Sequence, residues 1–303
     1  MATVVTTSAT AADPTGHADR VRRTVALLER RGYALSPTRL AEVCLGGPIS
    51  PAQLLASLPR SDLEVESGLV VSSTGRERAE AIRRRQAAHG AAAPAYLAEA
   101  ESFGRSLAGW FPFVTSVSIA GSLASGGFRE TDDVDLNLVV EDGYRHLAYV
   151  VLNLLGIAHA LRHRGKPVDA HSTRPVAPRV MTANLILERS QCFPLARQDE
   201  DMAYELLASR TVVGGPFLAT VVAANGGLVE HFPQLGAAVS GGVVAVWPRL
   251  SVRLFPALLD RPAKALGRAA WRYMQWTRRH RPEAVARVAF VRSTMRPYAL
   301  FDD

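Results

Sequence analysis

The sequence predicts an α/β protein with a mixed α+β sheet, and three observations lead to this class. Short helical segments with clear start signals occupy the first part of the chain. Two strand-like segments, residues 115–120 and 134–140, follow near the middle, and the second of them alternates apolar and polar side chains. A long apolar run, residues 147–161, comes directly after these strands. Strands interleaved with helices indicate a sheet covered by helices.

The composition indicates a globular protein with a sizeable core. The chain has 303 residues, of which 48% are hydrophobic, and its formal net charge is +7. A basic surface favours anionic partners such as nucleotides. Almost all of this charge is arginine, a usage common in proteins from GC-rich genomes, so nucleic acid is the less favoured partner.

The same composition predicts a cytoplasmic protein. The first residues lack the basic and apolar segments of a signal peptide. Cys44 and Cys192 are too few and too far apart for a disulfide framework. The longest apolar run, residues 147–161, is shorter than the ~20 residues that a membrane span needs. We therefore expect no membrane partner.

We expect residues 1–16 to form a disordered leader and residues 17–90 to form a winged-helix-like module. Within the module, Ser-Pro pairs at residues 36–37 and 50–51 predict the starts of two short helices after a first helix that ends near residue 31. Residues 63–73 predict a hairpin. The helix at residues 50–58 offers few polar side chains for reading DNA, so a role in packing or protein interaction is favoured.

We expect the rest of the chain to form a second domain, residues 91–235, and then a C-terminal helical region, residues 236–303. A charged helix at residues 76–88 and an amphipathic helix at residues 96–109 are separated by a Gly-Ala-Pro segment that marks the expected boundary. In the C-terminal region, arginines alternate with aromatic residues, a pattern that can bind nucleic-acid bases or anionic lipid. At helical spacing, Trp271 and Met274 are expected to pack on the domain while the arginines face water.

The residues with chemical potential lie between the two central strands. Gly121-Ser122 ends the first strand, and Asp133-x-Asp135 opens the second eleven residues after Ser122. Side chains two apart share one face of a strand, so the two carboxylates lie about 6 to 7 Å apart at their Cα atoms. At ~5 Å between oxygens their repulsion is roughly 3 kcal/mol, which a cation offsets. Magnesium suits oxygen ligands and bridges carboxylates to substrate phosphates.

The combination of a strand, Gly-Ser and then Asp-x-Asp inside an apolar strand resembles the signature of the DNA polymerase β-type nucleotidyltransferase superfamily. The matching segments are Ser-Ile-Ala-Gly-Ser-Leu-Ala-Ser-Gly, residues 118–126, and Asp-Asp-Val-Asp-Leu, residues 132–136. The wider layout, over about residues 65–235, is similar to stand-alone prokaryotic nucleotidyltransferase-domain proteins.

This resemblance implies transfer of a nucleoside monophosphate from a nucleoside triphosphate, with ATP expected as donor, to a small-molecule acceptor. Asp133 and Asp135 would bind two magnesium ions and be the catalytic residues. Gly121 and Ser122 would position the triphosphate, since backbone amides and a hydroxyl at such a turn can hold phosphate oxygens.

In catalytic members of the superfamily, a third carboxylate from a later strand completes the metal site. The inward candidate on the strand expected at residues 180–187 is Asn184, which is a departure from the pattern. Glu188 and Asp169 are the alternatives, and a site with no third carboxylate is the remaining one. The departure keeps a second function open, namely a nucleotide-binding sensor or scaffold protein without turnover, whose N-terminal module binds DNA or a protein.

Two basic residues are candidates for neutralising the donor phosphates. Lys166 is one of only two lysines, and Arg129 lies between the Gly-Ser turn and Asp133. For each of them the alternative is a solvated surface charge.

Overall fold

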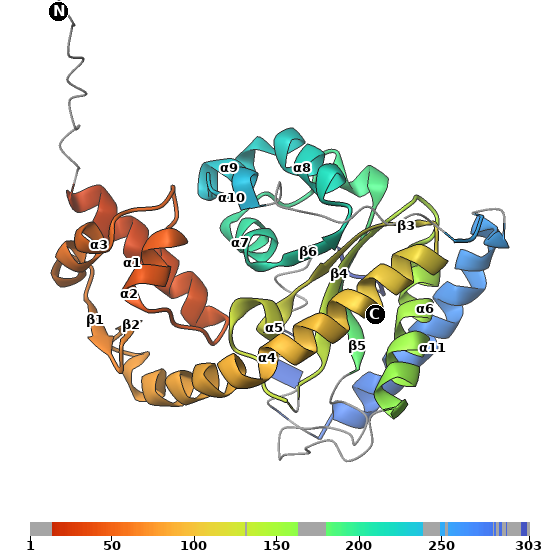
Figure 1. Cartoon of the computed structure of the whole chain (residues 1–303), viewed down its shortest axis with the longest axis horizontal. Helices are drawn as coiled ribbons and strands as arrows, with labels where there is room; N and C mark the ends of the chain where they lie inside the picture. The colour runs from red at the N-terminus through yellow and green to blue at the C-terminus, as the bar shows by residue number, and fades with distance from the viewer. Residues whose placement is uncertain are drawn as a thin grey trace, which may run out of the picture. The chain divides into compact units, whose positions relative to one another are not determined.

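The structure is a computed structural model that describes residues 14–130, 132–162, 180–238, 249–251, 254–280 and 298–301, together with residues 282, 285, 286 and 289. Its chain forms two compact units, residues 1–83 and 84–303 (Figure 1). Most of the expected leader, residues 1–16, lies outside the described residues. Within the described residues, no helix combines the length and apolar character needed to cross a membrane.

The first unit contains the three helices and the hairpin that the sequence predicts. Ser36 caps one helix through a bond from the Arg39 amide, and Ser50 exchanges hydrogen bonds with Gln53 in a capping box that starts the next. The elements are α1 (Pro14–Arg30), α2 (Pro37–Glu42), α3 (Pro51–Ser57), the 3₁₀ turn η1 (Leu58–Arg60), β1 (Leu63–Glu66) and β2 (Leu69–Ser72). Strands β1 and β2 pair antiparallel.

A single helix, α4 (Arg76–Trp110), replaces the two helices expected at residues 76–88 and 96–109. It passes through Pro94, where the sequence predicts a break, and the division between the units falls inside it, after Arg83. The neighbours of this proline, Ala93 and Tyr96, are buried in the core of the second unit. Their packing therefore outweighs the cost of the amide that proline lacks.

The second unit is built on a mixed four-stranded sheet with the order β5-β4-β3-β6. Strands β3 and β4 pair antiparallel, as do β3 and β6, whereas β4 and β5 are parallel. The strands are β3 (Val114–Ile119), β4 (Val134–Val140), β5 (Met181–Glu188) and β6 (Arg210–Val213). The mixed sheet confirms the predicted α/β class.

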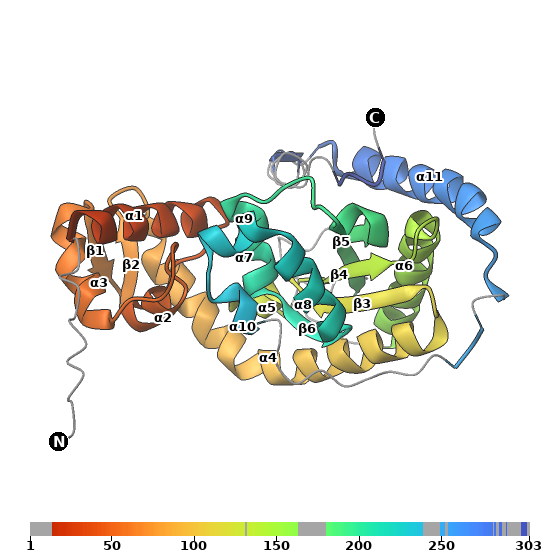
Figure 2. The same ribbon diagram turned by 90° about the horizontal axis from the view of Figure 1, so that it is seen from above.

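Helices cover both faces of this sheet (Figures 1 and 2). The apolar side chains of β4 pack in the main core with α4 and with α6 (Arg145–Arg162). Side chains of α7 (Glu200–Ala208) and α8 (Gly215–Ala224) lie over the opposite face. The shorter helical elements are α5 (Gly121–Ser125), η2 (Arg189–Cys192), α9 (Gly226–His231), α10 (Leu235–Ala238) and η4 (Ala257–Leu259).

The C-terminal part of the chain belongs to the second unit, rather than forming a separate region from residue 236 onward. Helix α11 (Asp260–Arg278) packs beside α6, as Figures 1 and 2 show. Trp271 packs against the main core, as expected, and Phe301 is buried in it.

Candidate functional site

A left-handed glycine brings the end of β3 against the start of β4. Gly121 has φ +61°, a conformation that side chains strongly disfavour. A Cβ atom at this position would lie 2.3 Å from Oδ2 of Asp135, and the Ala120 amide donates a 2.9 Å hydrogen bond to the Asp135 carbonyl oxygen. Only glycine therefore lets the turn lie directly against this carboxylate.

The two carboxylates of Asp-x-Asp are placed together by a third residue, Thr182. Its hydroxyl Oγ1 lies 3.2 Å from Asp135 Oδ1 and 3.4 Å from Asp133 Oδ2. One hydroxyl proton can be donated to only one of these oxygens at a time. The two acids therefore share a donor and present their oxygens toward the same point, as their spacing along the strand predicts.

The loop between α5 and β4 is held by Asp132, the residue just before the pair. Its Oδ2 accepts a hydrogen bond from the Ser122 hydroxyl at 3.3 Å and another from the Arg129 amide at 3.0 Å. Ser122 and Arg129 are thus joined through one carboxylate, and both lie close in the fold to the start of β4. Asp132 therefore fixes the loop beside the carboxylate pair.

Helix α4 supports the same loop through His89. The Phe128 amide donates a 3.2 Å hydrogen bond to Nδ1 of His89, and the Phe128 ring is buried against Tyr96. An accepting Nδ1 requires a neutral imidazole. Burial lowers the pKa of His89, which favours this neutral form.

The register of β4 and β5 decides which residue faces the carboxylate pair. Asp135 lies opposite Thr182, so a hydroxyl occupies the position beside it on the neighbouring strand. The pairing then shifts by one residue, because Leu136 faces Ala183 while Asn137 faces Leu185. Asn184 is the extra residue in this bulge, and the simple alternation of sides is lost there.

The structure does not bring the predicted third-site residues Asn184 and Glu188 to the pair. The Asn184 amide donates to Asn137 and to Glu205 instead, at 2.9 and 2.8 Å. Glu188 lies opposite Val140, six residues along the strand from Thr182, which is roughly 20 Å away at the rise of a strand. Its carboxylate accepts a bond from the Gly143 amide.

Asn137, Asn184 and Glu205 form a buried polar cluster next to the carboxylate pair on the same face of β4. Glu205, on α7, is 7% exposed, and its Oε1 accepts bonds from both amides, at 3.3 Å from Asn137 and 2.8 Å from Asn184. These bonds satisfy a buried polar group and attach α7 to the sheet. No sequence pattern predicts the position of this carboxylate, because α7 is distant from β4 along the chain.

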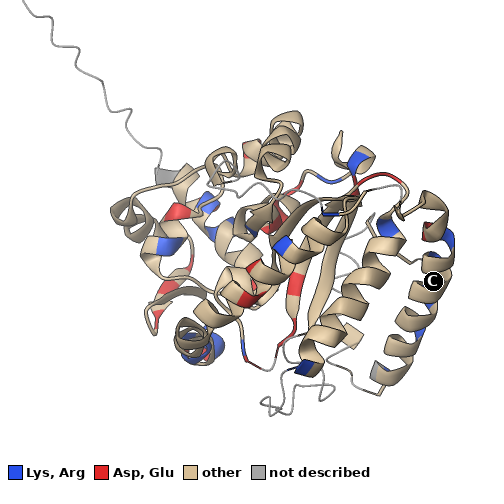
Figure 3. Ribbon diagram, turned by 45° about the vertical axis from the view of Figure 1, so that its right-hand side comes forward, with Lys and Arg blue, Asp and Glu red and all other residues tan. Residues whose placement is uncertain are grey.

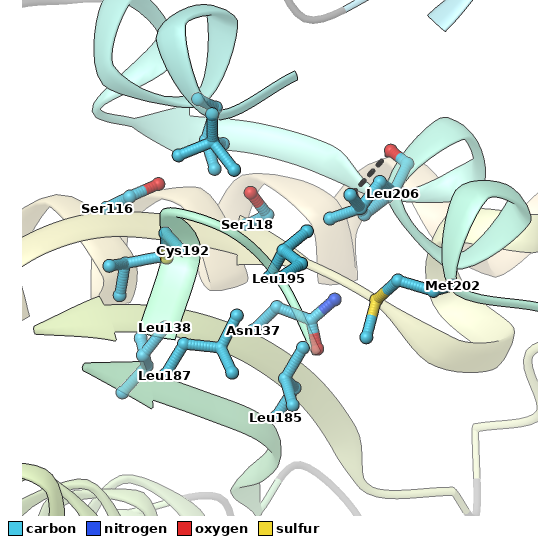
Figure 4. Close-up of a pocket in the computed structure, with 14 residues that line it drawn as sticks. Ser116, Ser118, Asn137, Leu138, Leu185, Leu187, Cys192, Leu195, Met202 and Leu206 are labelled. Carbon is cyan, nitrogen blue, oxygen red and sulfur yellow. Dashed lines mark hydrogen bonds between the residues drawn. The ribbon is translucent and has the colours of Figure 1, made fainter. Parts of the chain in front are cut away.

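Beyond this cluster, a small cavity of about 20 Å³ lies between the sheet and helices α7 and α8 (Figure 4). Such a volume holds about one water molecule. Its lining is mainly aliphatic, and burial raises the pKa of Cys192 in its wall to about 12, so this thiol stays protonated and unreactive. The cavity is a packing space and not a substrate pocket.

The remaining predicted residues, Lys166 and Asp169, lie outside the described residues. Within the part of the chain that the structure describes, no group of three or more His, Cys, Asp or Glu residues could hold a metal ion. Of the predicted site, the structure thus brings together Gly121, Ser122, Asp133 and Asp135, with Arg129 joined through Asp132. Thr182 and Asp132 are contacts that the sequence reasoning missed.

Comparison of the chain with protein-family models, with curated proteins and with solved structures gives no match.

Proposed function

We propose that this protein is a magnesium-dependent nucleotidyltransferase that transfers a nucleoside monophosphate from a nucleoside triphosphate, with ATP as the expected donor, to a small-molecule acceptor. The acceptor oxygen would attack the α-phosphorus, the bond from that phosphorus to the bridging oxygen would break, and pyrophosphate would leave. The acceptor would lose its proton to solvent. Rate would come mainly from positioning and charge stabilisation.

The observation that supports this proposal most is the contact between Gly121 and Asp135. It places the main chain of a Gly-Ser turn directly against a carboxylate whose neighbour, Asp133, is joined to it through Thr182. A phosphate held by the turn would therefore lie close to the carboxylate pair. An arrangement that needs glycine for close approach is typical of sites where backbone meets a ligand.

The residues present suit magnesium. The donor set consists of carboxylate and hydroxyl oxygens, and Mg²⁺ is commonly held by one or two carboxylates together with substrate phosphates. When bound, two such ions would neutralise phosphate charge and align the reacting oxygens. Asp133 and Asp135 would hold them, and Ser122 and Arg129 would contact the donor phosphates. Lys166 remains a candidate for the same role.

One observation favours a second function, a nucleotide-binding sensor or scaffold without turnover. The position on β5 beside Asp135 carries the hydroxyl of Thr182, and neither Asn184 nor Glu188 brings a third group to the pair, although catalytic members of the proposed superfamily have a third carboxylate from a later strand. A hydroxyl cannot accept the proton of an acceptor alcohol as a carboxylate can. In this version Asp133 and Asp135 bind a magnesium nucleotide, and the first unit contacts DNA or a protein.

Calorimetric titration of each nucleoside triphosphate, with and without magnesium, tests the proposal. We expect binding that requires magnesium and is lost in Asp133→Asn and in Asp135→Asn. Asp142→Asn is the matched control, because Asp142 is exposed and follows the opposite end of β4. Binding that survives both site substitutions would contradict both functions.

Mass spectrometry of mixtures with candidate acceptors then separates the two functions. A product heavier by one nucleoside monophosphate, together with pyrophosphate, supports the transferase. Tight magnesium-dependent binding that gives no product with any acceptor supports the sensor. For the sensor version that binds DNA, fluorescence anisotropy at low salt should show affinity that falls steeply as salt is added.

A further inference from the structure

Helix α11 (Asp260–Arg278) and the residues just after it are strongly basic. Residues 261–282 contain seven Lys or Arg and no Asp or Glu, which equals the net charge of +7 for all 303 residues. The basic residues are Arg261, Lys264, Arg268, Arg272, Arg278, Arg279 and Arg281. The other residues sum to a formal charge of zero, so this segment is a strong local attractor for polyanions. Basic positions recur along the helix in Figure 3.

The first residue of α11 fixes which way the helix faces. Oδ1 of Asp260 accepts hydrogen bonds from the His146 and Leu147 amides at 2.7 and 2.8 Å, and its Oδ2 lies 2.8 Å from His146 Nδ1. Gly267, on the same helix, lies close to the ring of Phe301. With these contacts, one side of α11 packs on the second unit and the other faces outward.

The outward side is apolar and aromatic. Leu266, Tyr273 and Trp276 are 57%, 60% and 58% exposed, and their spacing of seven and three residues puts them on one helical face. The rings of Tyr273 and Trp276 stack on each other with centroids 6.1 Å apart. Leu258, just before the helix, is 70% exposed.

The arginines form a row along one border of this apolar face. At 100° per residue, Arg261, Arg272 and Arg279 fall within about 20° of one another, next to the sector of Trp276. All three are exposed, and the guanidinium of Arg279 lies 4.3 Å from the Trp276 ring centroid. An exposed apolar face bordered by cations is the pattern of helices that lie in the plane of an anionic membrane surface.

We propose that α11 binds the surface of anionic lipid bilayers, with Leu266, Tyr273 and Trp276 entering the headgroup region and the arginines contacting lipid phosphates. A second copy of the chain is a poorer occupant, because two such basic helices would repel each other. Nucleic acid would satisfy the arginines and stack on the aromatic rings, but it offers nothing to exposed leucines. The expectation of no membrane partner rested on the absence of a spanning run, and a surface helix needs none.

Co-sedimentation with vesicles tests this inference on the full chain. We expect binding to vesicles of phosphatidylcholine and phosphatidylglycerol in equal amounts, little binding to phosphatidylcholine alone, and weakening by salt. Arg272→Gln should weaken binding about fivefold. Trp276→Ser should weaken it about tenfold or more, since it removes a large amphipathic ring.

Trp110→Ser is the matched control, because Trp110 is also an exposed tryptophan with an arginine, Arg249, above its ring. The Trp110→Ser variant should bind anionic vesicles as well as the unsubstituted protein does. The inference fails if anionic vesicles are not bound, or if Trp276→Ser and Trp110→Ser bind equally. It also fails if a single-stranded RNA is bound through Trp276 while vesicles are not. Because none of these readouts uses nucleotide, they leave the proposed transferase untouched.

Discussion

The two faces of strand β4 have opposite character and are held by different kinds of contact. On one face Val134, Leu136 and Val140 are fully buried in the main core under α4 and α6. On the other face Asp135 contacts the Gly-Ser turn and Thr182, and Asn137 contacts Glu205. The apolar face needs only volume and hydrophobicity from its neighbours, whereas each polar side chain needs one particular partner in one orientation.

One strand therefore has two roles: its apolar face stabilises the fold, and its polar face holds the candidate site. Side chains two apart on the apolar face all contribute to the core. Those on the polar face bring charges close together, at a cost that a bound cation would offset. Substitutions on the two faces should therefore differ in what they change.

Leu136→Ala, on the apolar face, should lower the free energy of unfolding more than any other substitution considered below. Leu136 is completely buried, so we expect the free energy of unfolding to fall by about 2–5 kcal/mol. Urea denaturation followed by circular dichroism measures the change. Leu154→Ala on α6 is the control, because that side chain is 61% exposed and should cost little. Equal losses in both would mean that this face is not the core.

Gly121→Ala should displace the Asp135 carboxylate on the polar face. Both Gly121 and Gly126 have positive φ, so an alanine at either position should cost about 1–2 kcal/mol in backbone strain. Only at Gly121 does the added Cβ meet Asp135. Displacement of the carboxylate should weaken magnesium-dependent nucleotide binding about hundredfold in Gly121→Ala, and much less in Gly126→Ala. Calorimetry on the two variants gives the comparison, and equal losses would contradict it.

Asn137→Leu should show that the polar face is a network. It removes a donor to the buried Glu205 and the acceptor of the Asn184 amide, so we expect a loss of about 1–3 kcal/mol in unfolding free energy. A double-mutant cycle with Asn184→Leu checks this, since the two losses should not add. Additive losses would mean that the two amides act independently.

Thr182→Val removes a hydroxyl from the polar face while nearly keeping the shape of the side chain. It removes the hydroxyl shared by Asp133 and Asp135, and we expect a loss of about 1 kcal/mol without magnesium. The loss should shrink when magnesium is present, because the cation then offsets the repulsion instead. Thermal unfolding with and without magnesium measures both values. A cost that magnesium leaves unchanged would argue against a metal at this pair.

The smallest effect should come from pH, acting on the loop beside the polar face. The pKa of His89 is lowered in the folded protein by burial, so the unfolded chain binds the proton more readily. The contribution of His89 to the free energy of unfolding is complete above the ordinary pKa of 6.5. It is lost as the pH falls through the lowered pKa that His89 has in the folded protein. His89→Gln keeps an acceptor for the Phe128 amide without a titration. Urea denaturation from neutral to mildly acidic pH should therefore show a weaker dependence on pH in the variant.

Most of the fold could be predicted from local sequence patterns. The serine caps at Ser36 and Ser50, the hairpin after them and the alternation in β4 each depend on residues close together in the chain, and each is confirmed. The unbroken α4 was missed, because the packing of Tyr96 that keeps helix through Pro94 is a tertiary contact.

The candidate site was predictable only in part, for a similar reason. The proximity of Gly121 and Asp135 follows from two antiparallel neighbouring strands. The register of a parallel pair sets which residue lies opposite Asp135, and a bulge sets where Asn184 lies; neither can be read from the sequence. Glu205 reaches the cluster from a helix far along the chain, so no spacing rule points to it.

The continuity of α4 has a consequence for how the protein can be divided. A protease cleaves most readily at exposed, flexible loops, and the division between the two units lies inside a helix. A fragment that begins at residue 91, where composition suggests a boundary, would also lack His89 and the helical turns before it. Excision or exchange of the second unit, whether by limited digestion, cloning or recombination, would have to begin upstream of His89 to keep the contact that holds the Phe128 amide.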